Sequence, residues 1–297
     1  MTNCIRCGRP IADTASGAAN LCPECRQAFA SSAQPPTIPL RTTLGALQRP
    51  ATFRPPVTMA LVGVNVLVFI AMVLSGVSPM GPSETQLIRW GADFGPYSLA
   101  SQPWRILTSN YVHIGLFHIL LNMWCLWNLG RLAERILGPW TYFLTYTACG
   151  IAGSLVSLWK HPTAVGAGAS GAIFGLAGAL ITALYLGKLP YPGQTLRGLM
   201  KSLISFAGYN LFFGAVVPGI DNSAHIGGLL TGLAIGALLA PQLHESPDRR
   251  RAHERMMFTA TALVLIGLAA FVKHQSGWVV EKFREQGPRP ELNDTNP

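Results

Sequence analysis

The chain has 297 residues, of which 49% are apolar and 12% carry a charged side chain, and its mean hydropathy is +0.33. About a quarter of the residues of a typical soluble domain are charged, so this composition excludes that class and predicts a membrane-embedded protein. The formal net charge of +9 would suit a nucleic-acid-binding protein if the basic residues shared one surface. The basic residues instead lie in separate segments between the apolar blocks, mostly on one side of the expected membrane. We therefore expect no nucleic acid partner.

Residues 1–30 contain four cysteines in a C-x2-C-x14-C-x2-C pattern, namely Cys4, Cys7, Cys22 and Cys25. At this spacing four thiolates can complete a tetrahedral zinc site, and a reducing cytoplasmic location argues against disulfides. So short a segment buries too little apolar surface to fold alone, so bound zinc would supply most of its folding energy. We predict a zinc-ribbon-like module with structural Zn, since no ligand position is left open for catalysis. Docking of a cytoplasmic protein partner is the alternative role.

Residues 31–56 are rich in proline, serine and threonine and have no apolar period, which predicts a linker. Beyond it the apolar residues gather into seven blocks, each able to supply the roughly 17 to 25 residues of a transmembrane helix. The blocks are residues 57–78, 112–130, 139–159, 168–187, 200–217, 223–241 and 256–274. The sequence therefore predicts an all-α polytopic membrane protein.

The basic residues indicate the orientation of the chain in the membrane. With a cytoplasmic N-terminus, 15 of the 22 lysine and arginine residues fall in cytoplasmic segments, and the external loops hold only Arg89, Arg105 and Lys160. Cytoplasmic loops are the ones enriched in these residues. We therefore expect a cytoplasmic N-terminus and an extracytoplasmic C-terminus, and this topology accounts for the positive net charge.

A long loop, residues 79–111, follows the first apolar block and contains Trp90, Phe94, Tyr97 and Trp104. Loops of this length in compact proteins are usually functional or disordered, and aromatic side chains favour the membrane interface. We expect an external loop that is partly immersed in the membrane. A plain solvated connector is the alternative.

Polar residues inside the apolar blocks are the candidates for function, because burying them in hydrocarbon is costly. They are His113, His118 and Asn122 in the second block, Ser170 in the fourth and His225 in the sixth. Even-numbered blocks run from outside to inside, and each of these residues lies near the start of its block, so all are expected in the outer half of the membrane. Gly228 and Gly232 lie on the face of His225 and would allow a neighbouring helix to approach closely. Ser170 and His225 are therefore expected to meet.

A serine hydroxyl becomes a good nucleophile when a neighbouring imidazole takes its proton. The apolar blocks contain neither aspartate nor glutamate, so the expected minimum is a dyad of Ser170 and His225, with Asp221 at best bordering the site. His118 and Asn122 are four residues apart on one helical face and could stabilise an oxyanion together with the Ser170 N–H. His113 is five residues before His118, which places it on another face.

Other protease mechanisms fit the sequence less well. The HExxH motif of metalloproteases is absent, and no pair of acids in the blocks could share a proton as in aspartic proteases. The GASG sequence around Ser170 matches the GxSxG elbow only in part, because residue 172 is alanine. Cys125 and Cys149 lie inside apolar blocks and are expected to be packing residues.

Four motifs resemble the rhomboid intramembrane serine proteases in identity and order. They are WR at Trp104 and Arg105, HIGLFHILLN at residues 113–122, GASG around Ser170 and AHIGGLLTG at residues 224–232. The resemblance covers roughly residues 55–241. It implies a six-helix core, residues 57–241, with a water-filled cavity open to the outside.

The resemblance also implies roles for single residues. Ser170 is expected to be the nucleophile and His225 the general base, with His118 and Asn122 at the oxyanion and no cofactor for catalysis. Gly168 matches the glycine two residues before the nucleophile, and Trp104, Arg105 and Glu134 match structural positions. Residues 242–297 would add a basic cytoplasmic loop, a seventh transmembrane helix and a tail, as in family variants with one extra C-terminal helix.

The expected function is that of an intramembrane serine endopeptidase in the plasma (inner) membrane. Its partners would be the lipid bilayer and transmembrane or membrane-anchored protein substrates, cleaved near the outer face. A non-catalytic adaptor or chaperone for transmembrane segments is the alternative, although an intact serine–histidine pair argues against it. A solute transporter would show inverted repeats and broken helices around a midplane site, and the sequence shows neither.

Overall fold

The computed structural model describes residues 2–4, 7, 9–11, 24–25, 54–187, 192–244 and 247–286. The chain forms two compact units, Met1–Phe53 and Arg54–Pro297. In the first, strands β1 (Thr2–Asn3) and β2 (Pro10–Ile11) pair in antiparallel register. Cys22 and residues 31–53 of the expected linker lie outside the described residues.

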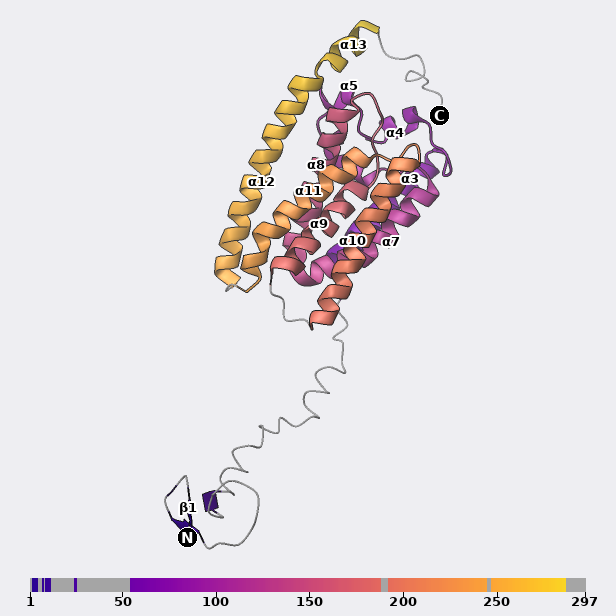
Figure 1. Ribbon diagram of the computed structural model, residues 1–297. Helices are drawn as coiled ribbons and strands as arrows, with labels where there is room; N and C mark the ends of the chain where they lie inside the picture. The colour runs from indigo at the N-terminus through magenta and orange to yellow at the C-terminus, as the bar shows by residue number, and fades with distance from the viewer. Residues whose placement is uncertain are drawn as a thin grey trace. The chain divides into compact units, whose positions relative to one another are not determined.

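The second unit is a bundle of helices whose long members match the seven predicted apolar blocks (Figure 1). They are α3 (Pro56–Leu74), α7 (Leu116–Leu137), α8 (Pro139–Lys160), α9 (Ser170–Leu186), α10 (Gly193–Val216), α11 (Asn222–Leu239) and α12 (Pro247–Ser276). Five of them, α3, α8, α10, α11 and α12, are long and apolar enough to cross a membrane, and α7 joins them when counted with the bent segment before it. The prediction of an all-α polytopic membrane protein is confirmed.

Helix α9 is shorter than the predicted fourth block, with 17 residues beginning at Ser170. The segment before α9 is not helical, and its backbone bonds to the loop of residues 79–111. Asp93 and Gly166 exchange two hydrogen bonds of 2.8 Å, and Gly168 N donates to Ser109 O at 2.9 Å. Non-helical backbone is tolerated within a membrane protein where neighbouring protein satisfies it. The helix itself is central, packed against α7, α8, α10 and α11.

The loop of residues 79–111, called the first loop from here on, is folded. It contains α4 (Glu84–Arg89), α5 (Gly95–Ser98), α6 (Arg105–Thr108) and the 3-10 turn η1 (Ser109–Tyr111). Leu87 and Ala92 are buried against Met72 of α3, and the Arg105 guanidinium donates to the Ile88 and Ala92 carbonyls. The loop is therefore a packed part of the second unit and no plain connector. The segment α6–η1 meets α7 at a bend of 92°.

Glycines allow α9 and α11 to pack backbone against backbone. A Cβ atom at Gly228 would overlap the Gly171 carbonyl, and one at Gly232 would overlap the Gly175 carbonyl. Small residues at such positions let membrane helices approach closely. This contact joins the helix that begins at Ser170 to the helix that carries His225.

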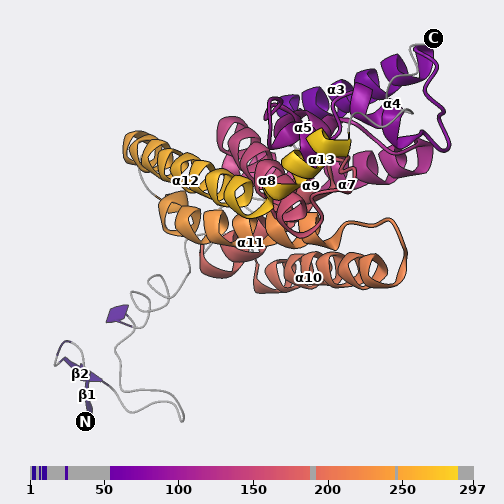
Figure 2. The ribbon, with the colours of Figure 1, turned by 90° about the horizontal axis from the view of Figure 1, so that it is seen from above.

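After the short turn η2 (Ala240–His244), helix α12 returns along α8, and α13 (Trp278–Gln286) follows it. Seen from above, α13 lies beside α5 and α8 (Figure 2). The N-terminal part of α12 is fastened to the bundle by polar contacts. Glu254 accepts from Thr141 at 2.9 Å and from Arg250 at 2.8 Å, and Arg250 also donates to the Leu137 carbonyl at the end of α7.

Candidate active site

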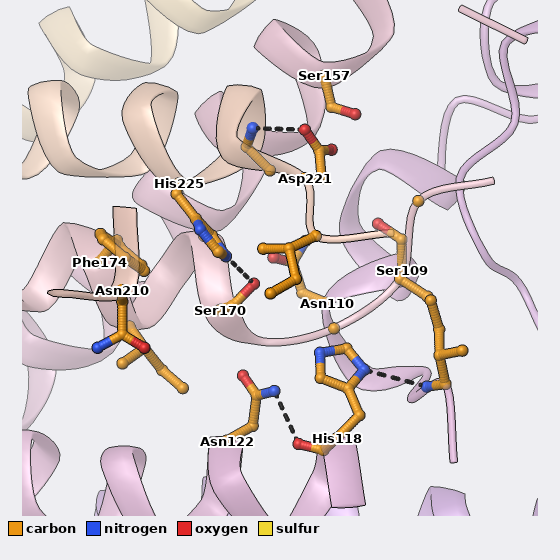
Figure 3. A pocket seen from close by; sticks show the side chains of 18 of the residues that line it. Ser109, Asn110, His118, Asn122, Ser157, Ser170, Phe174, Asn210, Asp221 and His225 are labelled. Carbon is orange, nitrogen blue, oxygen red and sulfur yellow. Dashed lines mark hydrogen bonds between the residues drawn. The ribbon is translucent and has the colours of Figure 1, made fainter. Parts of the chain in front are cut away.

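Ser170 and His225 are 55 positions apart in the sequence, yet their side chains meet (Figure 3). The Ser170 Oγ and the His225 Nε2 are 2.9 Å apart, which is hydrogen-bonding distance. Ser170 is the first residue of α9, and His225 lies in the first turn of α11. The two elements present these side chains to each other because glycines permit the close contact of α9 with α11.

The His225 ring is held on two sides. The Phe174 ring stacks on it with centroids 4.2 Å apart and an interplanar angle of 13°. The Asn222 Oδ1 lies 3.3 Å from the His225 Nδ1, and the Asn222 Nδ2 donates to the Leu211 carbonyl at 2.9 Å. Because that carbonyl can only accept, the amide must turn its oxygen toward the imidazole. Nδ1 therefore carries the proton, and Nε2 is free to accept one from Ser170.

Asn222 was missed by the sequence analysis, which considered only a carboxylate as a third member. Asp221 lines the same cavity, but its carboxylate accepts from the backbone N–H groups of Ser223 and Ala224 at 2.9 and 3.1 Å. It therefore caps the N-terminus of α11, as an aspartate often does. The signal for Asn222 was its position three residues before His225, on the same face of the helix.

His118 and Asn122 lie on α7 and face the same cavity (Figure 3). The His118 Nδ1 accepts from the Ile114 backbone N–H at 3.2 Å, so its Nε2 carries the proton and can act as a donor. The Asn122 Nδ2 donates to the His118 carbonyl at 2.9 Å. A Cβ atom at Gly168, whose φ is +125°, would lie 2.9 Å from the His118 Nε2, so a glycine is needed where the chain passes this ring.

The cavity around these residues has a volume of about 430 Å³. Its polar lining consists of Ser170, His225, His118, Asn122, Asp221, Asp93, Ser109, Asn110, Ser154, Ser157 and Asn210. Ser109 and Ser154 hydroxyls are 3.3 Å apart. Apolar side chains such as Phe117, Leu121 and Phe213 complete the lining. A cavity of this size is in the range of ligand-binding pockets, which are mostly apolar with a few polar groups placed in them.

The chain is similar to proteins of a known family. The rhomboid domain model matches residues 100–242. The chain is 31% identical over 209 residues to rhomboid protease AarA of Providencia stuartii, and the alignment covers 62% of this chain and 73% of that protein. It is 33% identical over 234 residues to rhomboid protease GluP of Bacillus subtilis, covering 78% of this chain and 44% of that protein.

The chain belongs to the rhomboid family. It is accordingly a multi-pass integral membrane protein. It is also 35% identical over 205 residues to RHOMBOID-like protein 6, mitochondrial, of Arabidopsis thaliana, covering 64% of this chain and 66% of that protein. The chain spans about half the length of the first curated relatives that it matches, GluP and RHOMBOID-like protein 4 of Arabidopsis thaliana, 44% and 50% respectively.

Other residues singled out in the sequence occupy supporting positions in this rhomboid. The buried Glu134 carboxylate accepts from the backbone N–H groups of Val57 and Thr58 at 2.9 and 2.8 Å, which caps α3. His113 is buried and is not among the cavity-lining residues. Cys149 is fully buried in the main apolar core, whereas Cys125 is half-buried and lines the cavity.

The N-terminal unit lies outside the matched rhomboid domain. The thiol sulfurs of Cys4, Cys7 and Cys25 lie within 4.8 Å of one another. Tetrahedral zinc with Zn–S bonds of about 2.3 Å places its sulfurs about 3.8 Å apart, so this donor set fits a zinc ion. The fourth cysteine of the pattern, Cys22, is outside the described residues.

Proposed function

We propose that this rhomboid is an intramembrane serine endopeptidase with Ser170 as nucleophile and His225 as general base. The observation that carries the proposal is the 2.9 Å contact between the Ser170 Oγ and the His225 Nε2 at the wall of a cavity. A base at this distance, with its tautomer set by Asn222, is what a serine nucleophile requires. The names of the relatives GluP and AarA, both rhomboid proteases, support the same activity.

In the proposed reaction the Ser170 Oγ bonds to the carbonyl carbon of the scissile peptide while its proton passes to the His225 Nε2. The resulting oxyanion accepts hydrogen bonds from the His118 Nε2–H, the Asn122 amide and the Ser170 backbone N–H. The C–N bond then breaks, and His225 gives its proton to the leaving amine. A water molecule, deprotonated by His225, hydrolyses the ester and restores Ser170. These groups supply every proton transfer, so the proposal requires no cofactor for catalysis.

The proposed substrates are transmembrane or membrane-anchored proteins. Ser170 and His225 lie in the first turns of α9 and α11, whereas the basic residues expected in the cytoplasm follow the C-terminal ends of these helices. With a cytoplasmic N-terminus this places the cavity near the outer face of the plasma (inner) membrane. The cavity can hold an unwound segment of a substrate helix, whose exposed backbone groups would find polar partners there.

The decisive experiment is labelling with a serine-directed fluorophosphonate together with cleavage of a transmembrane reporter. Ser170→Ala should abolish both, and His225→Ala should slow cleavage by about 10³-fold or more. Ser202→Ala, an exposed serine on α10, is the matched control and should behave as wild type. Full cleavage by both Ser170→Ala and His225→Ala would refute the proposal. A wild-type protein that holds transmembrane segments without labelling would point to the adaptor alternative.

For the N-terminal unit we propose a structural zinc site formed by Cys4, Cys7, Cys22 and Cys25. The support is the clustering of the three described thiols together with the spacing of the fourth cysteine. A cytoplasmic partner of this module stays a prediction from the sequence. Purified protein should contain one zinc per chain, and Cys4→Ser should lose it while retaining cleavage. Cys125→Ser, a cysteine of α7, should keep its zinc; stoichiometric zinc in Cys4→Ser would contradict the assignment.

A further inference from the structure

Helix α13 has an amphipathic sequence that the proposed chemistry does not use. Its apolar residues Val279 and Phe283 lie four apart on one face. Val279 is 3% exposed and packs in an apolar cluster with Leu99 of the first loop and Leu155 of α8. The charged residues Glu281, Lys282, Arg284 and Glu285 are exposed. The apolar face of α13 is therefore already occupied by the rhomboid core.

Phe283 makes the contact with the first loop. Its ring is 5.9 Å from the Phe94 ring and 5.5 Å from the Tyr97 ring, both in edge-to-face geometry, and Phe94 and Tyr97 are themselves 5.8 Å apart. Three rings at these distances form a mutually favourable cluster. Two of the rings belong to α5 and its N-cap, and the third comes from a helix nearly 190 residues later in the chain.

The same stretch of the first loop is bonded to the segment that leads to Ser170. Asp93, next to Phe94, exchanges two backbone hydrogen bonds with Gly166, and Gly95 N donates to the Pro162 carbonyl at 3.0 Å. A Cβ atom at Gly95 would overlap that carbonyl, so residues 93–95 and 162–166 are in direct contact. A displacement of residues 93–95 would therefore be transmitted to residues 162–166, four residues before Ser170.

Helix α13 has a firm support on its other side. Helix α12 is fixed at its start by the contacts of Arg250 and Glu254 with α7 and α8. Near its end, Val272 is fully buried, and the Phe271 ring lies 6.0 Å from the Trp159 ring of α8. Helix α12 thus holds α13 at a defined place beside α5 (Figures 1 and 2).

We propose that α13 is a clamp on the first loop and that Phe283 is a positioning residue: its contact with Phe94 and Tyr97 holds residues 93–95 against residues 162–166 and so keeps Ser170 aligned with His225. This gives α12, the predicted seventh transmembrane helix, a role as the support of the clamp. The catalytic consequence rests on the proposed function, whereas the structural coupling does not.

The test compares amide hydrogen exchange in the full-length protein, reconstituted in lipid nanodiscs, for wild type and Phe283→Ala. Loss of the ring contacts should raise the exchange rate about tenfold in two separate segments, residues 92–99 and 162–168, while α7 and α10 keep the wild-type rates. Phe212→Ala is the matched control, because it removes a ring of the same size on α10 whose partner is Phe213 and not the first loop. It should leave both segments unchanged. Phe283→Tyr should restore the wild-type rates.

Cleavage of a transmembrane reporter supplies the second readout. Phe283→Ala should lower kcat about tenfold and change KM less than twofold, since alignment of Ser170 is affected more than substrate binding. Unchanged exchange in residues 162–168 of Phe283→Ala would overturn the inference, as would faster exchange throughout all helices, which indicates a merely structural role. If Ser170→Ala retained cleavage, the proposed function would fail, while the exchange comparison would still decide whether α13 is coupled to the Ser170 segment.

Discussion

At the scale of single residues, hydrogen bonds give His118 and His225, the two histidines that line the cavity, opposite protonation patterns. The Asn222 amide oxygen faces the His225 Nδ1, so His225 presents an unprotonated Nε2 to Ser170. The Ile114 N–H occupies the His118 Nδ1, so His118 presents a protonated Nε2 to the cavity. One histidine is therefore arranged to accept a proton and the other to donate a hydrogen bond.

Asn222→Ala tests this arrangement. The variant loses the acceptor at the His225 Nδ1, so the imidazole can adopt the wrong tautomer, and we expect kcat for reporter cleavage to fall about 10- to 100-fold with little change in KM. A buried aspartate in the same role contributes about 10⁴-fold, and a neutral amide should contribute less. Asn128→Ala, an exposed residue of α7 whose Nδ2 donates to the Trp124 carbonyl, is the control. Wild-type kcat in Asn222→Ala would show that His225 needs no such partner.

Asp93 predicts a pH dependence of stability. Burial raises the pKa of this carboxyl to about 7, against the lowering influence of Ser98 and Arg105. The folded protein therefore holds a proton that the unfolded chain, with an ordinary pKa of 3.8, releases. The resulting stabilisation is complete below about pH 3.8 and is lost as the pH rises to about 7.

Thermal unfolding in nanodiscs at pH 5 to 8 is the measurement. The midpoint of wild type should fall by several degrees from pH 5 to pH 7 and then level off, at about 2 to 4 °C per kcal/mol for a domain of this size. Asp93→Asn, which keeps the shape and cannot ionise, should remove this part of the slope. An equal slope in both proteins would assign it to other groups.

At the scale of elements, the contact between α9 and α11 decides whether the site exists. Backbone atoms of the two helices meet at Gly228 and Gly232, where any side chain would overlap a carbonyl of α9. The first loop and α13 also affect the site, because they hold the segment before Ser170 in place. The pairing of Ser170 with His225 thus depends on small residues that take no part in the chemistry.

Gly232→Val should separate α9 from α11. We expect a loss of thermal stability of about 2 kcal/mol or more, in the range for overpacked cores, together with loss of fluorophosphonate labelling. Gly267→Val is the matched control on α12, where a Cβ atom has no neighbour within 4 Å. It should retain both properties. Full labelling of Gly232→Val would mean that the helices can pack at a greater distance without separating the dyad.

At the scale of the whole molecule, the helix arrangement and the basic residues together predict the topology. Reporter fusions in a bacterial host should show a cytoplasmic N-terminus and an extracytoplasmic C-terminus: alkaline phosphatase fused after residue 297 should be active, and a fusion in the turn between α11 and α12 should be inactive. The physical reason is the concentration of arginine in the expected cytoplasmic segments. Active phosphatase at the α11–α12 turn would reverse the orientation and place the cavity on the cytoplasmic side.

The sequence by itself determined the fold class and the membrane-spanning blocks, because long apolar segments have few alternatives to the helix in a bilayer. It also pointed to Ser170, His225, His118 and Asn122, since polar groups in apolar segments are rare and the topology sets their depth. The cysteine spacing indicated the zinc site in the same way, from local chemistry alone.

Only the tertiary structure decided how these groups are oriented. The role of Asn222 depends on the Leu211 carbonyl of α10, and the short α9 depends on the pairing of Asp93 with Gly166. The position of α13 depends on its contact with the Phe94 and Tyr97 rings of the first loop. Each is a contact between different elements of the fold, and the last two join segments far apart in the chain. Apolar periodicity tells which face of a helix is buried but not which distant partner it meets, and for that reason the clamp and the third member of the site emerged only from the assembled bundle.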